Sequence, residues 1–245
     1  ALAANYVAFN SAFHRDDFLA ALRSIANQPN NWLVESAIPE IEAKSAVLPV
    51  GVDLARFDGQ RSQPDSGPPI ILWNHRWEFD KAPELFIRAL ERLAAEGLDF
   101  RVAIAGEPGD NPVPALVEPG PAIAKRLVAH GFLESADDYA RLLWHSRIAV
   151  STSRQEFFGI AAIEAMYCEC LPILPRRLNY PALVPPGWES RCLWDSEDAL
   201  LALLRSALTA PLGDLTPLRS MAAGYDWATV IEEWDSAITR FARIS

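Results

Sequence analysis

The sequence predicts an α/β protein in which a doubly wound, Rossmann-like parallel sheet takes up most of the chain. Two observations carry this prediction. From residue 69 onward, the chain contains short apolar runs that are typical of buried strands. These runs alternate with segments of helical periodicity, each roughly 10–15 residues long. Strands separated by helices form βαβ units, and right-handed crossovers wind such units into one sheet. Ligands bind beyond the carboxyl ends of the strands in such sheets, so the loops at that edge are candidates for the functional site.

The first part of the chain contains two strand-like runs, at residues 5–11 and 46–52, with a helix predicted at 16–25 between them. Residues 53–68 then turn polar, with Asp-Gly, Gln, Ser and Pro, which predicts a linker. We therefore expect three parts, namely 1–52, the linker at 53–68, and a Rossmann-like domain at 69–245.

In the third part the element ends carry recognisable signals. Pro83 stands in the first turn of a helical segment and Gly97 at its end, while Ser135 and Ser196 precede helical segments as N-caps. The predicted strands are 69–73, 100–105, 131–133, 147–151, 171–174 and 192–194. The predicted helices are 83–96, 121–130, 135–146, 158–168, 196–208, 215–223 and 227–243.

Composition limits the classes of function. Of 245 residues, half are apolar and 22% are charged, as in folded globular proteins. Lys and Arg number 22 against 32 Asp and Glu, and the resulting net charge of −10 argues against broad nonspecific binding to nucleic acid or anionic membranes. No apolar run approaches the roughly 18 residues of a membrane span. Three cysteines, an odd and low number, favour a reducing compartment, so we expect a cytoplasmic protein.

The first cluster of chemically versatile residues follows the strand at 69–73. Asn74, His75, Arg76 and Lys81 stand between this strand and the next helix, where a phosphate group would meet two cations and the amides of the helix start. The competing interpretation is a solvated loop, in which Arg76 pairs with Glu78 or Asp80 and Lys81 pairs with Glu84.

The second cluster surrounds two acidic residues, Glu156 and Glu164, which are separated by seven residues that are all apolar or Gly. Gly159 would let a ligand approach the bare amides at a helix start. A carboxylate on that helix can accept hydrogen bonds from two hydroxyls of a sugar or ribose. The alternative is that Glu164 is an interior acid paired with another side chain, and of the two we favour the ligand-binding role.

Other sequence features are weaker. Phe132, in the segment Gly131-Phe132-Leu133, offers an aromatic face to a base, although such residues are more often core, and Gly106 ends the strand at 100–105. The sequence contains no G-x-G-x-x-G after a strand and no P-loop, which weakens dinucleotide and NTPase functions. It also contains no Asp-x-Asp, the usual carboxylate clamp for a magnesium-bound diphosphate, and no zinc pattern, so we expect no metal and no cofactor.

Several of these motifs resemble a known family. The run from Glu156 to Glu164 is similar to the E-x(7)-E signature of retaining glycosyltransferases with the GT-B fold, of the large family four type. The segment 50–57, Val-Gly-Val-Asp followed by Arg-Phe, resembles an interdomain segment of that family. The segments 71–81, 156–161, 164–168 and 177–181, and also 9–11, resemble more specifically the tRNA-queuosine mannosyltransferases within it.

The resemblance implies that 69–245 is a carboxy-terminal donor-binding half and that 1–52 is the tail of an amino-terminal, acceptor-side domain. It implies that Arg76 and Lys81 hold the diphosphate, that Glu164 binds the ribose and that Glu156 binds the hexose, with Arg76, Lys81 and Glu156 serving catalysis. The remaining donor-binding residues implied are Asn74, His75, Gly106, Phe132, Leu133, Phe157, Phe158, Gly159 and Ile160. The donor implied is GDP-mannose or another nucleotide sugar, and the acceptor is queuosine in tRNA, reached through the absent amino-terminal domain. Position 169 is Glu where the family tends to have Gly.

Two alternatives stay open at this stage. In the first alternative, the chain is a nucleotide-sugar-binding module without turnover. In the second, it is a glycosyltransferase that acts on a lipid or glycan acceptor. The acidic balance of the chain mildly favours the second alternative over tRNA, whereas the specific motif at 71–81 favours tRNA.

Overall fold

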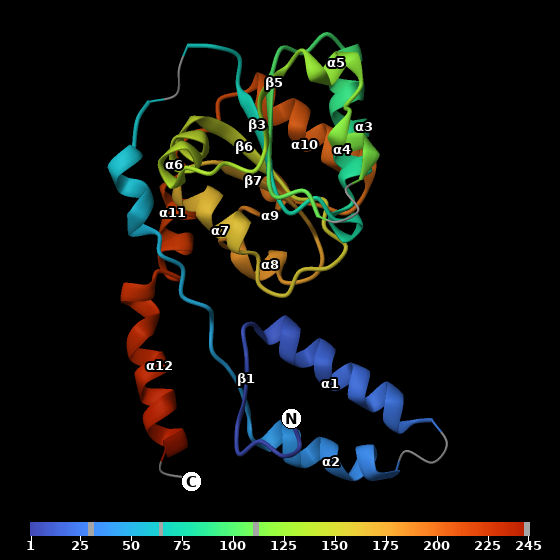
Figure 1. Cartoon of the computed structure of the whole chain (residues 1–245), viewed down its shortest axis with the longest axis vertical. Coiled ribbons are helices and arrows are strands. Elements are labelled where there is room, and N and C mark those ends of the chain that lie inside the picture. The colour runs from blue at the N-terminus through green and yellow to red at the C-terminus, as the bar shows by residue number, and fades with distance from the viewer. Residues whose placement is uncertain (29–31, 64–65, 110–112, 243–245) are drawn as a thin grey trace. The chain divides into compact units, whose positions relative to one another are not determined.

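The computed structural model describes residues 1–28, 32–63, 66–109 and 113–242. Contacts divide the chain into two compact units, one formed by Ala1–Val52 with Tyr225–Ser245 and the other by Asp53–Gly224. Figure 1 shows the second unit as a twisted sheet with helices on both sides. The predicted α/β class is confirmed.

In the described part of the second unit, six strands form one sheet in the order β5-β4-β3-β6-β7-β8, and every neighbouring pair is parallel. Chain order reverses between β3 and β6, which makes this the topological switch point of the sheet, where a crevice opens at the carboxyl edge. The strands are β3 (Ile70–Asn74), β4 (Arg101–Ala105), β5 (Leu127–Gly131), β6 (Ser146–Val150), β7 (Leu171–Pro175) and β8 (Leu193–Trp194).

The helices of the second unit cover both faces of this sheet. Helix α3 packs against α4, α5 and α10, whereas α7 packs against α6 and α11, and the two groups lie on opposite sides in Figure 1. Because both faces are covered, the central strands are apolar throughout, and Leu72, Trp73 and Ile104 have no exposed surface. The helices are α3 (Pro83–Ala95), α4 (Pro114–Val117), α5 (Pro121–Ala124), α6 (Ala136–His145), α7 (Ile160–Tyr167), α8 (Tyr180–Leu183), α9 (Glu189–Cys192), α10 (Glu197–Thr209) and α11 (Thr216–Ala223), with 3₁₀ turns η1 (Ala55–Gln60) and η2 (Phe79–Lys81).

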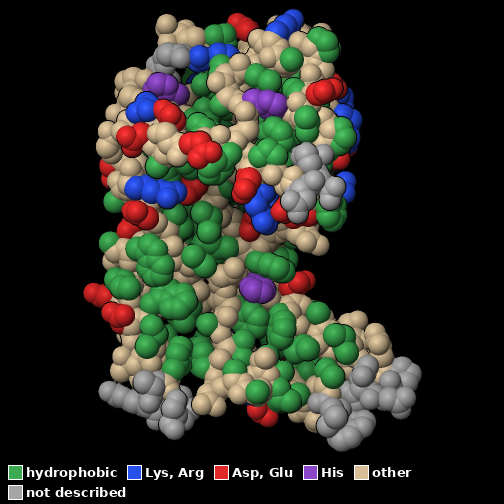
Figure 2. Space-filling model, viewed as in Figure 1, with side chains coloured by type: hydrophobic (Ala, Val, Ile, Leu, Met, Phe, Trp, Pro, Cys, Tyr) green, Lys and Arg blue, Asp and Glu red, His purple; other side chains and the backbone are tan. Residues whose placement is uncertain are grey.

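The first unit joins the two ends of the described chain. Strands β1 (Val7–Phe9) and β2 (Ser45–Val47) pair in parallel, flanked by α1 (Ala12–Ala26), α2 (Trp32–Ala43) and the carboxy-terminal α12 (Trp227–Ala242). The indole N–H of Trp234 on α12 donates to the carbonyl of Pro49 at 2.8 Å, and the rings of Tyr6 and Phe241 lie 3.7 Å apart. In Figure 2 hydrophobic side chains gather over α12, where Trp227, Ile231 and Ile238 are exposed.

The units differ from the predicted domains in two places. Residues 53–68, predicted as a linker, belong to the second unit, because η1 packs against α6 and buries Phe57. Residues 225–245, predicted to end the Rossmann-like domain, belong with residues 1–52, because α12 contacts that part of the chain. The polar segment therefore begins at the boundary between the two units, and part of it is folded as η1.

The prediction for 121–133 was wrong. The expected helix at 121–130 ends at Ala124, and Leu127–Gly131 forms edge strand β5 in place of the strand expected at 131–133. Exposure alternates between successive residues of β5, as the side-chain period of a strand allows at the edge of a sheet. The short helix α5 directly precedes β5, and its helical pattern hid this alternation in the sequence. The sequence analysis also missed α2, α4, α8 and α9, of which α2 contains an internal proline, Pro39. No helix among the described residues is long and apolar enough to cross a membrane.

Candidate functional site

A cavity of about 460 Å³ opens at the carboxyl edge of the sheet, beside the switch point. Loops that follow three neighbouring strands, β3, β4 and β5, contribute to its wall, together with η1 and α6. Its lining residues are Arg56, Asn74, His75, Arg76, Ala105, Gly106, Glu107, Phe132, Leu133, Glu134, Ala136 and Tyr139. Six residues predicted from the sequence therefore meet in one cavity, namely Asn74, His75, Arg76, Gly106, Phe132 and Leu133.

Gly106 brings two of these loops into close contact. Its φ is +157°, and a β-carbon placed there would lie 1.8 Å from the carbonyl oxygen of His75. Side chains cannot approach a backbone oxygen so closely, so only glycine lets the loop after β4 lie against the loop after β3. The wall of the cavity thus depends on the absence of a side chain at this position.

Glu164, on α7, is buried with 7% of its surface exposed, and both of its oxygens have partners. Arg56 Nη2 donates to Oε1 at 2.6 Å, and the hydroxyl of Tyr139 donates to Oε2 at 2.7 Å. The amide of Asn74 in turn donates to the Tyr139 hydroxyl at 3.0 Å and to the carbonyl of Ala161 at 3.1 Å. The interior pairing that the sequence left as an alternative for Glu164 is therefore present, and its partners line the cavity.

The electrostatics of this network follow from burial. Burial raises the pKa of Glu164 above its usual value, while the Tyr139 hydrogen bond and the Arg56 charge act in the opposite direction. Burial, and next the nearby Glu164 charge, raise the pKa of Tyr139 well above its usual range, so the phenol stays protonated and keeps its role as donor. A carboxylate has about four lone-pair positions, and two are occupied here, so Glu164 retains acceptor capacity.

His75 is a neutral imidazole in this wall. Burial and next the Lys81 charge lower its pKa to about 3, and a hydrogen bond with the backbone of Val150 opposes the shift only in part. Within the described residues its Nε2 has no hydrogen-bond partner. A buried ring nitrogen that lacks a partner costs free energy in this state, and the cost disappears when a suitable group comes within reach.

Lys81 and Glu156 meet at the switch point, outside the lining of the cavity. Lys81 is buried, and its Nζ donates to the carbonyl of Gln155 at 2.8 Å and lies 3.2 Å from Asp80 and 3.7 Å from Glu156. The predicted alternative partner Glu84 is not the one it uses. Arg76, by contrast, pairs with Glu78 at 3.2 Å with 67% of its side chain exposed, as the solvated-loop interpretation expected.

The amides expected to receive an anion already hold one. Glu156 Oε1 accepts hydrogen bonds from the N–H groups of Phe158, at 3.2 Å, and Gly159, at 3.1 Å. Gly159 has φ +103° and is the N-cap of α7, which begins at Ile160, two residues later than predicted. Phe157 and Ile160 are more than 40% exposed and do not line the cavity. Phe158 is buried.

Of the lining residues that the sequence analysis missed, Arg56 and Tyr139 are the two that bond to Glu164. Arg56 appeared in it only as part of a segment resemblance, and its partner Glu164 is 108 positions away. Tyr139 stands on α6, where nothing in the local pattern separates it from a packing residue. Among the described residues no group of three or more His, Cys, Asp and Glu side chains is placed to hold a metal ion.

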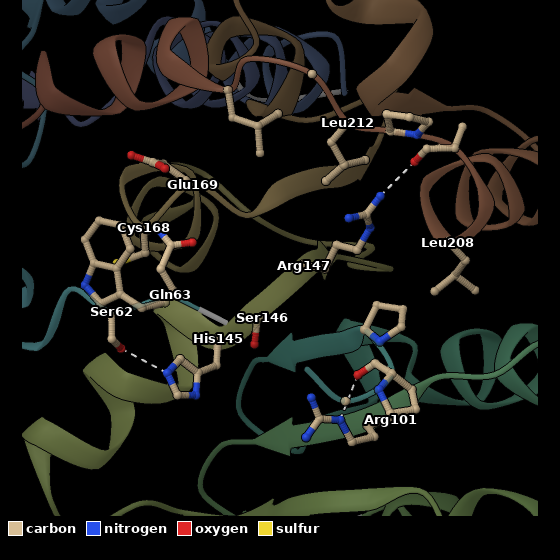
Figure 3. A pocket seen from close by; sticks show the side chains of 18 of the residues that line it. Ser62, Gln63, Arg101, His145, Ser146, Arg147, Cys168, Glu169, Leu208 and Leu212 are labelled. Atoms are coloured by element: carbon tan, nitrogen blue, oxygen red, sulfur yellow. Dashed lines mark hydrogen bonds between the residues drawn. The ribbon is translucent and has the colours of Figure 1, made fainter. Parts of the chain in front are cut away.

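A larger cavity, of about 1100 Å³, lies at the opposite, amino edge of the sheet (Figure 3). Its arginines hold loops in place. Arg147 donates to the carbonyls of Ala207 and Ala210, Arg101 donates to that of Pro68, and Arg61 pairs with Glu169. Since ligands of such sheets bind at the carboxyl edge, the smaller cavity is the candidate site.

Comparison with known proteins agrees with this geometry. The family model for "Glycosyl transferases group 1" matches residues 56–217, more than half of the chain, so the chain belongs to this family. A second model, "tRNA-queuosine alpha-mannosyltransferase N-terminal", matches residues 1–52. The resemblance to retaining GT-B glycosyltransferases noted in the sequence is confirmed.

Individual relatives narrow the comparison. The chain is 33% identical over 192 residues to the tRNA-queuosine alpha-mannosyltransferase of Drosophila melanogaster, an alignment that covers 75% of this chain and 51% of the relative. It is 26% identical over 240 residues to a GDP-mannose:cellobiosyl-diphosphopolyprenol alpha-mannosyltransferase of Xanthomonas campestris, covering 91% and 61%. The structure of a glycosyltransferase from Rickettsia africae aligns with TM-score 0.71 and 18% identity, over 99% of this chain and 64% of that one. The chain thus spans about half to two thirds of the length of these proteins.

Proposed function

We propose that this chain is the donor-binding half of a retaining glycosyltransferase that moves a hexose, mannose from GDP-mannose, onto queuosine in tRNA. The observation that carries the proposal is the cavity beside the switch point. It gathers Asn74, His75, Arg76, Gly106 and Phe132 in a chain that belongs to the group 1 glycosyl transferases. We place this enzyme in the cytoplasm, and its three free, buried thiols accord with a reducing compartment.

The donor lies along the carboxyl edge in this proposal. Its base contacts Leu133 and Phe132, a residue of the cavity lining that is 59% exposed. Its ribose hydroxyls use the remaining acceptor capacity of Glu164, and its diphosphate lies between Arg76 and Lys81. The hexose then reaches Glu156 and the amides of residues 158–160 at the start of α7.

The transfer requires charge stabilisation where the leaving group forms. The bond between the sugar C1 and the phosphate oxygen breaks, and its electron pair stays with the departing diphosphate. The acceptor hydroxyl oxygen bonds to C1 on the same face and passes its proton to a phosphate oxygen. Arg76 and Lys81 meet the growing negative charge, and a fixed, buried cation such as Lys81 acts in a less polar environment than water.

Two features support the choice of substrates. The match of residues 1–52 to the amino-terminal part of tRNA-queuosine mannosyltransferases supports the tRNA acceptor. Relatives from Xanthomonas campestris and Mycobacterium tuberculosis, the latter 27% identical over 174 residues, carry GDP-mannose in their names, which supports the guanine donor. Those names also mention lipid-linked acceptors, which keeps a lipid acceptor as the second candidate.

A thermal-shift comparison tests the donor. GDP-mannose at a hundredfold excess over its Kd should raise stability by about 2.7 kcal/mol, while UDP-glucose and ADP-glucose at the same concentration raise it less. Stabilisation by none of the three would refute the donor site. A larger shift with UDP-glucose than with GDP-mannose would refute the guanine assignment alone.

Transfer assays with the full-length enzyme test the reaction. Lys81→Ala should lower transfer at least tenfold, or about 1.4 kcal/mol, because it removes a buried cation beside the diphosphate. Arg88→Ala is the matched control, since Arg88 is paired with Glu197 on an exposed surface. Radiolabelled mannose should appear in queuosine-containing tRNA and not in a polyprenol-diphosphate glycan. Donor binding without transfer to either acceptor would leave a binding module in place of an enzyme.

A further inference from the structure

Exposed aromatic rings are concentrated at one edge of the second unit. Among the described residues, the aromatic side chains that rank as exposed are Phe79, Phe132, Phe157 and Trp227. Three of these four follow strands β3, β5 and β6 at the carboxyl edge of the sheet. Phe132 lines the cavity, whereas Phe79, which is 74% exposed, and Phe157, which is 42% exposed, do not. Neither Phe79 nor Phe157 therefore belongs to the wall of the donor cavity.

Backbone-directed hydrogen bonds hold the loops that carry them together. The N–H of Arg154 donates to the carbonyl of Asp80 at 2.6 Å, next to Phe79. Lys81 donates to the carbonyl of Gln155, and the hydroxyl of Thr152 donates to the carbonyl of Lys81 at 2.7 Å. These bonds fasten the loop after β3 to the loop after β6, so Phe79 and Arg154 share one rim.

A third loop adds positive charge to this rim. Arg177 Nη2 donates to the carbonyl of Ser153 at 3.1 Å, which places the loop after β7 beside Arg154. Arg154, Arg176 and Arg177 are all exposed. We call the set Phe79, Arg154, Phe157, Arg176 and Arg177 the Phe-Arg rim.

The acidic residues of the loops after β3 and β6 are paired with cations. Asp80 and Glu156 pair inward with Lys81 at 3.2 and 3.7 Å, and their side chains are only 15% and 22% exposed. Glu78 pairs with Arg76. In a chain of net charge −10, the rim thus presents guanidinium groups and aromatic faces while the neighbouring carboxylates are occupied.

We infer that the Phe-Arg rim binds the single-stranded anticodon loop of the acceptor tRNA, an inference that rests on the proposed function. Arginine forks bind phosphates, and exposed phenylalanine rings stack on unpaired bases, which are available in a loop and hidden in a duplex. The rim lies at the same edge as the cavity, so a loop held there would present its modified base beside the donor sugar. Phe79 supplies the stacking surface and Arg154 the phosphate contact.

Binding of a fluorescein-labelled anticodon stem-loop that carries queuosine, measured by anisotropy with this chain, tests the inference. Phe79→Ala should weaken the Kd at least fivefold, whereas Phe79→Trp, which keeps an aromatic face, should stay within about twofold of wild type. Arg154→Ala should weaken binding and reduce the slope of log K against log salt by about 0.7. Arg205→Ala is the control for charge, because Arg205 is exposed but pairs with Glu96 on the side of α3 and α10.

The outcomes separate this inference from the proposed function. If wild type responds to GDP-mannose and binds the stem-loop, but Phe79→Ala and Arg154→Ala bind it equally well, the rim is not the RNA site and the enzyme proposal stands. Equal losses for Phe79→Trp and Phe79→Ala would refute stacking. If the chain binds vesicles of anionic phospholipid through these residues and does not bind the stem-loop, the inference is overturned and the lipid acceptor gains support. A GDP-mannose shift that persists in Phe79→Ala shows that the donor site is intact.

Discussion

The pair between Arg56 and Glu164 offers a direct test of the site's electrostatics. Arg56→Ala removes the 2.6 Å hydrogen bond to Oε1 of Glu164, whose side chain is only 9% exposed. Among the described residues, the Tyr139 hydroxyl then remains as its hydrogen-bond donor. Hydrogen bonds to a charged group contribute about 1.5–3 kcal/mol, and the 45% exposure of the Arg56 side chain reduces this through solvent screening. We expect a loss of about 1–2 kcal/mol at neutral pH.

The sign of the pH dependence follows from the raised pKa of Glu164. A carboxyl whose pKa is higher in the folded than in the unfolded state contributes most to stability below its usual pKa of 4.5, and the contribution is lost as pH rises through the folded value. The Arg56 charge limits that loss by favouring the ionised form. Without Arg56 the folded pKa rises further, so the variant should lose more stability near neutral pH than near pH 4.5.

Urea denaturation of wild type and Arg56→Ala at about pH 7.5 and pH 4.5 measures both effects. Arg61→Ala is a matched control, since Arg61 also donates to a glutamate at 2.6 Å, but with 55% and 37% of the two side chains exposed, and should cost at most about 1 kcal/mol. In the background of Glu164→Gln the effect of Arg56→Ala should shrink. An equal loss at both pH values, or no coupling in this double mutant, would refute the reasoning.

Two further predictions concern the wall of the cavity. The pKa of His75 falls to about 3, so the stability that the neutral imidazole contributes above its usual pKa of 6.5 is lost as pH falls. His75→Gln should therefore remove about 1.6 kcal/mol of the decline in unfolding free energy between pH 6.5 and pH 5, measured by urea titration. An unchanged decline would contradict the neutral imidazole. Gly106→Ala should lower the unfolding free energy by about 3 kcal/mol, because the new β-carbon meets the His75 carbonyl oxygen. Gly59→Ala is the control, since a β-carbon there has nothing within 4 Å and should change the unfolding free energy little. Similar effects at both positions would contradict the close approach of the two loops.

The parts of the fold that local chemistry determines were predictable. Ser135 and Ser196 act as N-caps as expected, each accepting from an N–H three residues on, Asp138 and Ala199, at 3.2 Å. Apolar runs such as Ile70–Asn74 formed buried parallel strands because both faces of the sheet are covered. The candidate residues after β3, β4 and β5 met in one cavity because parallel topology brings the carboxyl ends of strands to one edge.

The parts that depend on distant partners were not predictable. Arg56 meets Glu164 only because η1 packs on α6 beside α7, and no local pattern carries that information. Helix α12 has the amphipathic pattern of any packing helix, and its pattern does not say that it returns to the first 52 residues. The exposure of Phe79 and Phe157 also escaped detection, since an isolated phenylalanine is more often buried than exposed.

The position of Glu156 has a consequence for donor binding. Its carboxylate accepts from the Phe158 and Gly159 amides and lies 3.7 Å from Lys81, so it occupies the electropositive place that the proposed diphosphate and hexose approach. A nucleotide that lacks the sugar would meet this negative charge without offering hydroxyl groups to it in return.

Glu156→Gln should therefore bind GDP more tightly than wild type, by about fivefold, because a repulsion near a buried cation is removed. GDP-mannose should gain less or lose affinity in the same variant, since its hexose would lose a carboxylate acceptor. Calorimetric titration with both ligands measures the difference, and an equal change in affinity for the two would separate Glu156 from sugar recognition.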